Sequence, residues 1–178
     1  MTLPASSADV LCPARCQVGE SPLWDPATAA LYWVDIEGRA VHRVGRDGRH
    51  RQWPVAERIG CIARHAQGGL LAAMETGLFH LRLGDDGSVD AQSLHAVQFP
   101  QPTMRFNDGR TDRQGRFWVT SLVRDASAPK EAGALYRCDA QGLAHTGLLG
   151  LATGNGLGFS PDGRVMYLSD SHPSVQQV

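Results

Sequence analysis

The chain has 178 residues, 42% of them hydrophobic, which is enough for one sizeable core and unlike the composition of a disordered protein. Its 17 basic and 18 acidic residues leave a formal net charge of −1, and no block of like charge occurs. This balance gives no electrostatic argument for nucleic acid or an anionic membrane as a partner, so we expect a small-molecule ligand. Residues 1–10 lack the features of a signal peptide and no apolar run is long enough to cross a bilayer, which predicts a cytoplasmic protein.

Short β-type runs bounded by Gly, Pro, Asp and Asn follow one another along the chain, and helix periodicity is nearly absent. An all-β fold is therefore predicted. The expected strands span residues 19–24, 30–35, 40–44, 50–54, 59–65, 69–74, 77–83, 90–97, 105–111, 116–122, 134–138, 143–149, 155–160 and 164–169, with at most the beginning of another after residue 171. The connection from Arg124 to Gly133 is long enough to predict a functional loop.

Four segments share one register, in which a polar slot is followed by a short apolar strand. The slots are Glu20, Gly60, Asn107 and Asn155, separated by 40, 47 and 48 residues. This period is typical of the blades of a β-propeller. We divide the single partial-propeller domain 1–178 into an N-terminal segment (1–15), blade 1 (16–57), blade 2 (58–103), blade 3 (104–152) and half of blade 4 (153–178).

Equivalent positions of successive blades converge on one axis, so Glu20, Asn107 and Asn155 are expected to face a common cavity. Their carboxylate and amide oxygens are suitable ligands for a hard divalent cation. Arg105 has several donors in a fixed plane and is the best candidate for binding sugar hydroxyls or a carboxylate. The alternatives are a strand-end carboxylate at Glu20, a turn former at Asn155, a surface arginine at 105 and an Asx-turn at Asn107.

Other side chains have a structural interpretation. Five aromatic residues recur on the inner strands and are predicted to lie in the core: Trp24, Trp33, Phe117, Trp118 and Tyr167. Four cysteines form no paired CxxC motif and are predicted to be buried or half-buried thiols: Cys12, Cys16, Cys61 and Cys138. No HExxH, GxSxG or phosphate-binding loop occurs, which argues against a zincin, a serine hydrolase and a nucleotide triphosphatase.

Three motifs in order resemble the SMP-30/gluconolactonase/regucalcin-like (LRE) family. They are Gly19-Glu20-Ser21-Pro22-Leu23-Trp24 with Leu31-Tyr32-Trp33-Val34-Asp35-Ile36, Arg105-Phe106-Asn107-Asp108-Gly109-Arg110 with Gly115-Arg116-Phe117, and Asn155-Gly156-Leu157 with Tyr167-Leu168-Ser169-Asp170-Ser171. The resemblance runs from about Val18 to the last residue.

The resemblance implies a six-bladed propeller with one divalent ion (Ca, Zn, Mg or Mn) in its central channel and hydrolysis of aldonolactones or related sugar lactones. It implies that Glu20 and Asn155 are metal ligands, that Arg105 and Asn107 contact the substrate, and that Asp125 is an acidic substrate contact. The family's remaining metal-binding aspartate, which is also its catalytic acid/base, has no counterpart in this chain, so the catalytic residue is unknown.

We therefore expect a C-terminally truncated family member with about three and a half four-stranded blades. The leading hypothesis is metal-dependent hydrolysis of a sugar lactone, which the truncated chain need not retain. The alternative is a non-enzymatic calcium- or sugar-binding protein. A third expectation is self-association through the open blade edge, where the strands of Leu157, Phe159, Val165 and Tyr167 would expose apolar surface.

Overall fold

The computed structural model describes residues 8–125, 132–171 and 176–177 of the chain, with β15 described by its backbone alone, and within them every regular element is a β-strand. The middle of the predicted long connection, residues 126–131, lies outside the described residues. The strands are β1 (Gly19–Asp25), β2 (Ala30–Asp35), β3 (Ala40–Gly45), β4 (His50–Pro54), β5 (Ile59–Arg64), β6 (Leu70–Met74), β7 (Gly77–Leu83), β8 (Val89–Ala96), β9 (Met104–Thr111), β10 (Phe117–Val123), β11 (Gly133–Asp139), β12 (Gly142–Leu151), β13 (Gly154–Phe159), β14 (Met166–Ser171) and β15 (Gln176–Gln177).

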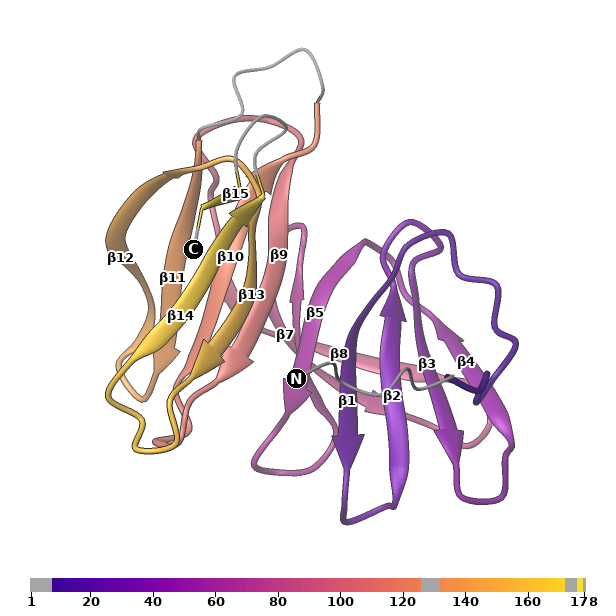
Figure 1. Ribbon diagram of the computed structural model, residues 1–178. Helices are drawn as coiled ribbons and strands as arrows, with labels where there is room; N and C mark the ends of the chain where they lie inside the picture. The colour runs from indigo at the N-terminus through magenta and orange to yellow at the C-terminus, as the bar shows by residue number, and fades with distance from the viewer. Residues whose placement is uncertain (1–7, 126–131, 172–175, 178) are drawn as a thin grey trace.

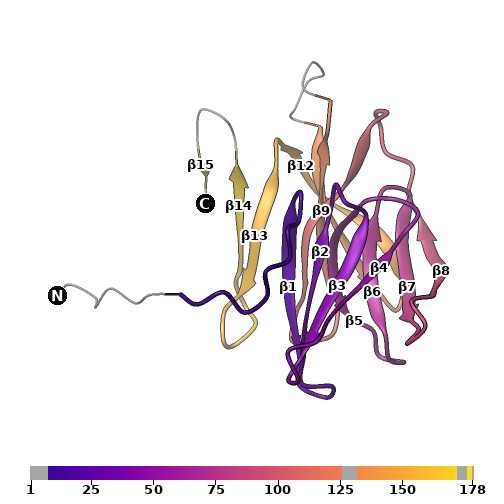
Figure 2. The same ribbon diagram turned by 90° about the vertical axis from the view of Figure 1, so that its right-hand side faces the viewer.

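These strands form four antiparallel sheets in chain order, as Figure 1 shows: β1–β4, β5–β8, β9–β12 and β13–β15. Each sheet is a meander in which consecutive strands pair. The first strands lie next to one another, because β1 contacts β5, β5 contacts β9 and β9 contacts β13. Figure 2 shows the same succession of sheets from the side. The all-β prediction and the predicted strand positions are confirmed.

Each sheet packs face to face on the next through an apolar cluster. Val34 and Val41 of the first sheet pack with Ile59, Leu70 and other residues of the second. Phe106, Phe117 and Tyr136 of the third sheet pack with Cys61 and neighbouring residues of the second. A smaller cluster around Leu135, Leu151 and Leu157 joins the third and fourth sheets. The core therefore consists of three intersheet layers rather than one centre.

Gly60 explains why one polar slot lacks a polar side chain. A Cβ atom at this position would lie 2.3 Å from the backbone oxygen of Phe106 and 2.6 Å from that of Asn107. Real Cβ atoms do not approach backbone oxygens this closely, so β5 and β9 pack at this distance only with glycine in the slot.

The prediction that all five aromatic residues lie in the core is wrong for two of them. Phe117 is buried and Trp33 and Trp118 are half-buried, but Trp24 is 54% exposed and Tyr167 is 53% exposed. Trp24 lies on the first sheet and Tyr167 on the last. Tyr167 alternates with Met166 and Leu168, which pack toward the third sheet, so its ring points to the opposite face.

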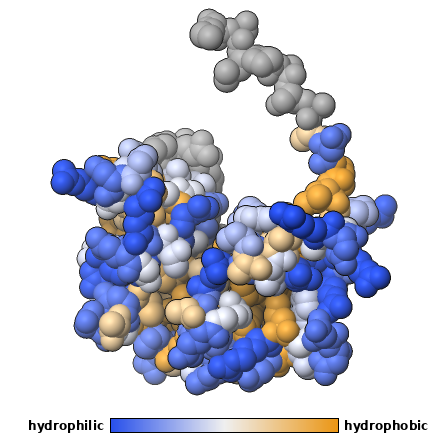
Figure 3. Space-filling model, turned by 90° about the horizontal axis from the view of Figure 1, so that it is seen from below, coloured by the Kyte–Doolittle hydropathy of each residue, from blue (hydrophilic) through white to orange (hydrophobic). Residues whose placement is uncertain are grey.

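The expected apolar edge is also only partly present. Val165 is 47% exposed, but Leu157 is buried because it packs between the third and fourth sheets. Figure 3 shows orange, hydrophobic areas among the hydrophilic ones on the underside of the molecule. The cysteine prediction is confirmed, since all four are free, Cys61 is buried and the others are half-buried.

No helix of the described residues is long and apolar enough to cross a membrane.

Candidate functional site

A pocket of about 480 Å³ lies where the first strands of the sheets converge, and it contains two of the predicted site residues. Glu20 of β1 and Asn155 of β13 both line it, although their strands belong to the first and last sheets. Figure 3 shows that the molecule is notched between its two lobes. The remaining lining residues are Ser21, Pro22, Leu23, Trp24, Ile62, Ala63, Asp108, Gly109, Arg110 and Thr111.

An irregularity in the strands places the first and last polar slots at this pocket. The pairing of β1 with β2 shifts between Glu20 and Leu23, and that of β13 with β14 shifts between Asn155 and Gly158. The residue after each slot has a positive φ, 54° at Ser21 and 65° at Gly156. A bulge of this kind re-aims side chains near the end of a strand.

The pocket is rich in oxygen atoms. Glu20 is exposed, and its carboxylate has no hydrogen-bond or ion-pair partner among the described residues. Asn155 accepts the Gly156 N–H at its Oδ1 at 2.9 Å. Asp108 also lines the pocket and accepts the Gly109 and Leu157 N–H groups. Two carboxylates and one amide oxygen thus gather around one cavity.

Arg105 and Asn107 are buried and are not among the residues that line this pocket. Both are 8% exposed. Arg105 Nη1 donates to Asn107 Oδ1 at 2.9 Å and to the Phe106 carbonyl at 2.8 Å, while Asn107 Nδ2 donates to the Gly154 carbonyl at 3.0 Å. Asn107 therefore ties β9 to the residue that precedes Asn155.

The guanidinium of Arg105 is left partly unsatisfied. Its Nε is buried and has no hydrogen-bond partner among the residues that the structure describes. Burial lowers the pKa of Arg105, Glu37 opposes this shift, and Arg124 adds to it. A buried donor without an acceptor is uncommon in proteins. Asp125, the remaining predicted contact, is exposed and follows Arg124 at the end of β10.

A group of charged residues that the sequence analysis did not single out lies at the ends of the inner strands. Arg58 donates from Nε to Glu37 at 2.8 Å and from Nη1 to Glu75 at 3.2 Å, and Arg124 Nη1 donates to Glu75 at 3.3 Å. The hydrogen bond between Arg58 and Glu37 raises the pKa of Arg58 and lowers that of Glu37. Of this group, Glu75 has a signal in the sequence, because it follows a polar slot by 15 residues, as Asp35 and Asp170 do.

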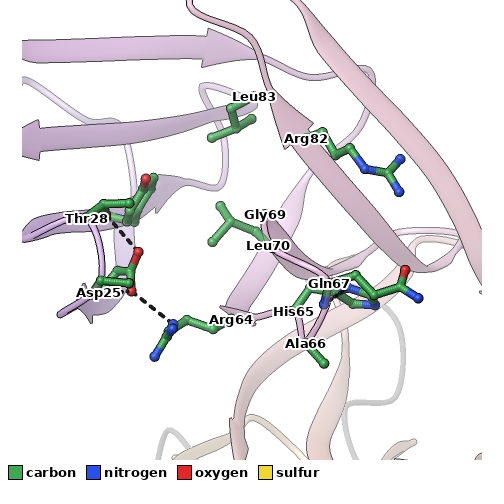
Figure 4. Close-up of a pocket in the computed structure, with 13 residues that line it drawn as sticks. Asp25, Thr28, Arg64, His65, Ala66, Gln67, Gly69, Leu70, Arg82 and Leu83 are labelled. Carbon is green, nitrogen blue, oxygen red and sulfur yellow. Dashed lines mark hydrogen bonds and ion pairs between the residues drawn. The ribbon is translucent and has the colours of Figure 1, made fainter.

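A second pocket, of about 520 Å³, lies between the first two sheets near Asp25 and Arg64 (Figure 4). Asp25 is already satisfied there, because it accepts from Thr28 Oγ1 at 2.7 Å and from Arg64 Nε at 3.0 Å. Arg82, on the other side of the pocket, pairs with Asp90 at 2.9 Å. None of the predicted site residues lines this pocket, and we assign it no catalytic role.

Known proteins are similar to this chain in sequence. The chain is 38% identical over 171 residues to an L-arabinolactonase from Azospirillum brasilense and 35% identical over 156 residues to a 6-deoxy-6-sulfogluconolactonase from Pseudomonas putida. These matches cover 94% and 86% of the chain but 56% and 52% of the relatives, so the chain spans about half their length.

A solved structure is also similar. The calcium-binding protein regucalcin from Agrobacterium tumefaciens superposes with a TM-score of 0.80 at 26% identity, over 90% of this chain and 53% of that one. The sequence model of the SMP-30/gluconolactonase/LRE-like region matches residues 18–177. The chain therefore belongs to the SMP-30/gluconolactonase/LRE-like family.

Proposed function

We propose that this chain carries part of the active site of a metal-dependent sugar lactonase that converts an aldonolactone to an aldonic acid. The observation that carries the proposal is that Glu20 and Asn155 line one pocket although they come from the first and last sheets. The relatives named above as lactonases support the substrate class. The complete architecture in this proposal is a six-bladed propeller, of which the four sheets are three blades and part of a fourth.

The oxygen donors fit a divalent cation. Glu20 offers a negative carboxylate with no described protein partner, and Asn155 offers a neutral carbonyl oxygen that keeps a second lone pair beside its bond to Gly156. Asp108 adds negative charge to the same wall. An all-oxygen set suits Ca, Mg or Mn, with Zn possible when few ligands bind. Such an ion supplies a Lewis acid for the lactone carbonyl and lowers the pKa of bound water.

Arg105 and Asn107 have the positioning role in this proposal. Asn107 holds the β13 backbone at Gly154 and thereby fixes the position of Asn155. Arg105 holds Asn107 Oδ1, and its buried Nε is a donor for a hydroxyl or carboxylate oxygen of the ligand. Asp125, at the end of β10, is proposed to accept hydrogen bonds from sugar hydroxyls.

Ring opening of a lactone consumes water and yields a carboxylate, a hydroxyl group and a proton at neutral pH. A pH-indicator assay therefore reports turnover directly. We expect hydrolysis of aldonolactones that depends on added Ca, Mg, Mn or Zn and is lost in Glu20→Gln and Asn155→Ala. Asp90→Asn is the charge-matched control, because the Asp90 pair with Arg82 is exposed and neither residue lines the pocket.

The assay is run on the 178-residue chain and on a full-length family member with the same two substitutions. Metal-dependent turnover in the longer protein and its loss in both variants support the proposal. Metal-independent turnover, or full activity of either variant, refutes it.

One observation favours the alternative of ion or sugar binding without turnover. Of the carboxylates on the described pocket wall, Glu20 is assigned to the ion and Asp108 is bonded to backbone N–H groups, so neither is available as a general base. Calorimetry distinguishes the two: ion binding that Glu20→Gln abolishes, together with no lactone hydrolysis by this chain, supports the binding protein.

A further inference from the structure

A second group of potential metal ligands lies on the first sheet, away from the oxygen-lined pocket. The sulfur of Cys16, a carboxylate oxygen of Asp35 and a ring nitrogen of His42 all lie within 4.8 Å of one another. Cys16 precedes β1, Asp35 ends β2 and His42 lies on β3. Asp35 and His42 are buried and Cys16 is half-buried. None of the three lines the pocket that contains Glu20.

The sulfur of Cys16 accepts a hydrogen bond and lies near His42. Trp33 Nε1 donates a hydrogen bond to Cys16 Sγ at 3.3 Å, and Sγ lies 3.9 Å from His42 Nε2. In a tetrahedral zinc site with ordinary bond lengths, a sulfur and a nitrogen ligand are separated by about 3.6 Å. The observed separation differs from this by a few tenths of an ångström, which a side-chain adjustment can supply.

The imidazole of His42 is oriented by a second histidine. His42 Nδ1 lies 2.8 Å from His50 Nε2, and the two ring planes differ by 6°. The hydrogen bond therefore lies close to the common plane of the rings. Histidines that bind metals usually make such an outer hydrogen bond, which directs the other ring nitrogen toward the ion.

The Asp35 carboxylate is fixed by backbone N–H groups and keeps a lone pair with which it can bind an ion. Its Oδ1 accepts the N–H groups of Val18 and Gly38, while Oδ2 accepts that of Gln17 at 2.9 Å. Since each carboxylate oxygen has two lone pairs, Oδ2 keeps one after bonding Gln17. These bonds also fix the backbone next to Cys16.

The last sheet shows that this backbone arrangement does not require the thiol. Asp170 accepts the N–H groups of Ala152 and Thr153 in the same way, but Leu151 stands at the position that corresponds to Cys16. The carboxylate turn is thus a repeated structural element, whereas the thiol and the imidazole are additions to the first sheet.

We infer that Cys16, Asp35 and His42 form a binding site for a thiophilic divalent cation, Zn²⁺, with His50 as a positioning residue. Sulfur and imidazole ligands select zinc over Ca and Mg, which prefer all-oxygen sites. This site is independent of the proposed lactonase function and uses different residues.

Zinc calorimetry on the metal-free 178-residue chain, in a phosphine reductant, tests the site. We expect Cys16→Ser and His42→Gln each to weaken zinc binding by about 10-fold or more, and His50→Ala by a smaller factor. Cys12→Ser is the matched control, because it removes another half-buried thiol of the same segment. Glu20→Gln separates this site from the oxygen-lined pocket. Cys12→Ser is expected to bind zinc as the unsubstituted chain does, whereas Glu20→Gln is expected to keep the zinc bound by Cys16 while it loses any ion bound in the oxygen-lined pocket.

Cobalt substitution gives an independent readout. Co²⁺ bound by Cys16 produces a thiolate charge-transfer band in the near ultraviolet, which Cys16→Ser removes and Cys12→Ser retains. Unchanged zinc affinity in Cys16→Ser, or a cobalt spectrum without the band, overturns the inference. If His42→Gln does not fold, Cys16→Ser and His50→Ala provide the same test, because Cys16 is half-buried and His50 is exposed.

Discussion

The carboxylate of Asp108 on β9 accepts the backbone N–H of Leu157 on β13 at 3.1 Å and so joins the third sheet to the fourth. The first two sheets contain the same connection, because Ser21 Oγ accepts the Ile62 N–H at 2.9 Å. In both, the residue after a polar slot bonds the second residue after the slot of the next sheet. Polar side chains at these positions therefore hold neighbouring sheets in register beside the pocket.

Removing this acceptor is expected to destabilise the protein. In Asp108→Ala the buried Leu157 N–H loses its partner, which costs about 1–3 kcal/mol. Asp108→Asn keeps an acceptor and is expected to cost less. Urea denaturation measures both, with the loss seen in the midpoint at an unchanged slope. Equal stability of the alanine variant and the unsubstituted chain contradicts this role.

Gly60 and Gly158 make a matched pair for testing how tightly the inner strands pack. A Cβ at Gly60 would meet the Phe106 carbonyl at 2.3 Å, whereas nothing lies within 4 Å of a Cβ at Gly158. We expect Gly60→Ala to lower stability by about 1–3 kcal/mol or to prevent folding, and Gly158→Ala to have little effect. Thermal unfolding followed by circular dichroism compares them. Similar midpoints for the two variants would show that β5 and β9 can separate without cost.

Much of the fold could be read from the sequence, because alternation and turn residues specify strands locally. The exposure of Trp24 and Tyr167 could not be predicted from the sequence. Alternation assigns a side chain to one face of a sheet but does not show whether another sheet covers that face.

The site was predictable to a similar extent. The repeat spacing predicted that Glu20 and Asn155 would share a cavity, and they line one pocket. It did not predict that the amide of Asn107 bonds the Gly154 carbonyl while the next residue, Asp108, lines the pocket. The sequence also did not predict the Cys16–His42 contact, because this contact joins an irregular segment to β3 and follows no motif spacing.

Asp112 is expected to make stability depend on pH. Burial alone raises the pKa of this carboxyl, but hydrogen bonds from Trp118 Nε1 at 2.9 Å and Arg116 Nε at 2.6 Å outweigh it, and the net shift is downward. The folded state therefore binds the proton less readily than the unfolded state. Its stabilising contribution is complete above the ordinary pKa of 3.8 and is lost as pH falls through the lower folded value.

The test compares urea unfolding of the unsubstituted chain and Asp112→Asn between neutral pH and pH 3. The variant is expected to be less stable at neutral pH, and the difference between the two proteins is expected to shrink below the ordinary pKa. A difference that stays constant over this range would mean that Asp112 acts through shape and hydrogen bonding rather than charge.

Glu75 is expected to contribute more to stability than an acidic residue in an exposed pair. It accepts from Arg58 and Arg124, so it links the second and third sheets at the ends of their inner strands. Its side chain is 23% exposed, whereas that of Asp85, which pairs with Arg51, is 98% exposed. Partly buried charges are screened less by solvent and salt. Loss of Glu75 removes the carboxylate that pairs with Arg124 and leaves Arg58 paired with Glu37 alone.

We expect Glu75→Gln to lower the free energy of unfolding by about 1 kcal/mol or more and Asp85→Asn to change it by less than about 0.5 kcal/mol. Both substitutions remove one negative charge, so the change in net charge is the same. Denaturant titrations at low and high salt distinguish the contributions, because the effect of the exposed pair disappears with salt while that of Glu75 largely persists. Equal effects of the two substitutions at low salt would mean that the Glu75 contacts add nothing beyond surface electrostatics.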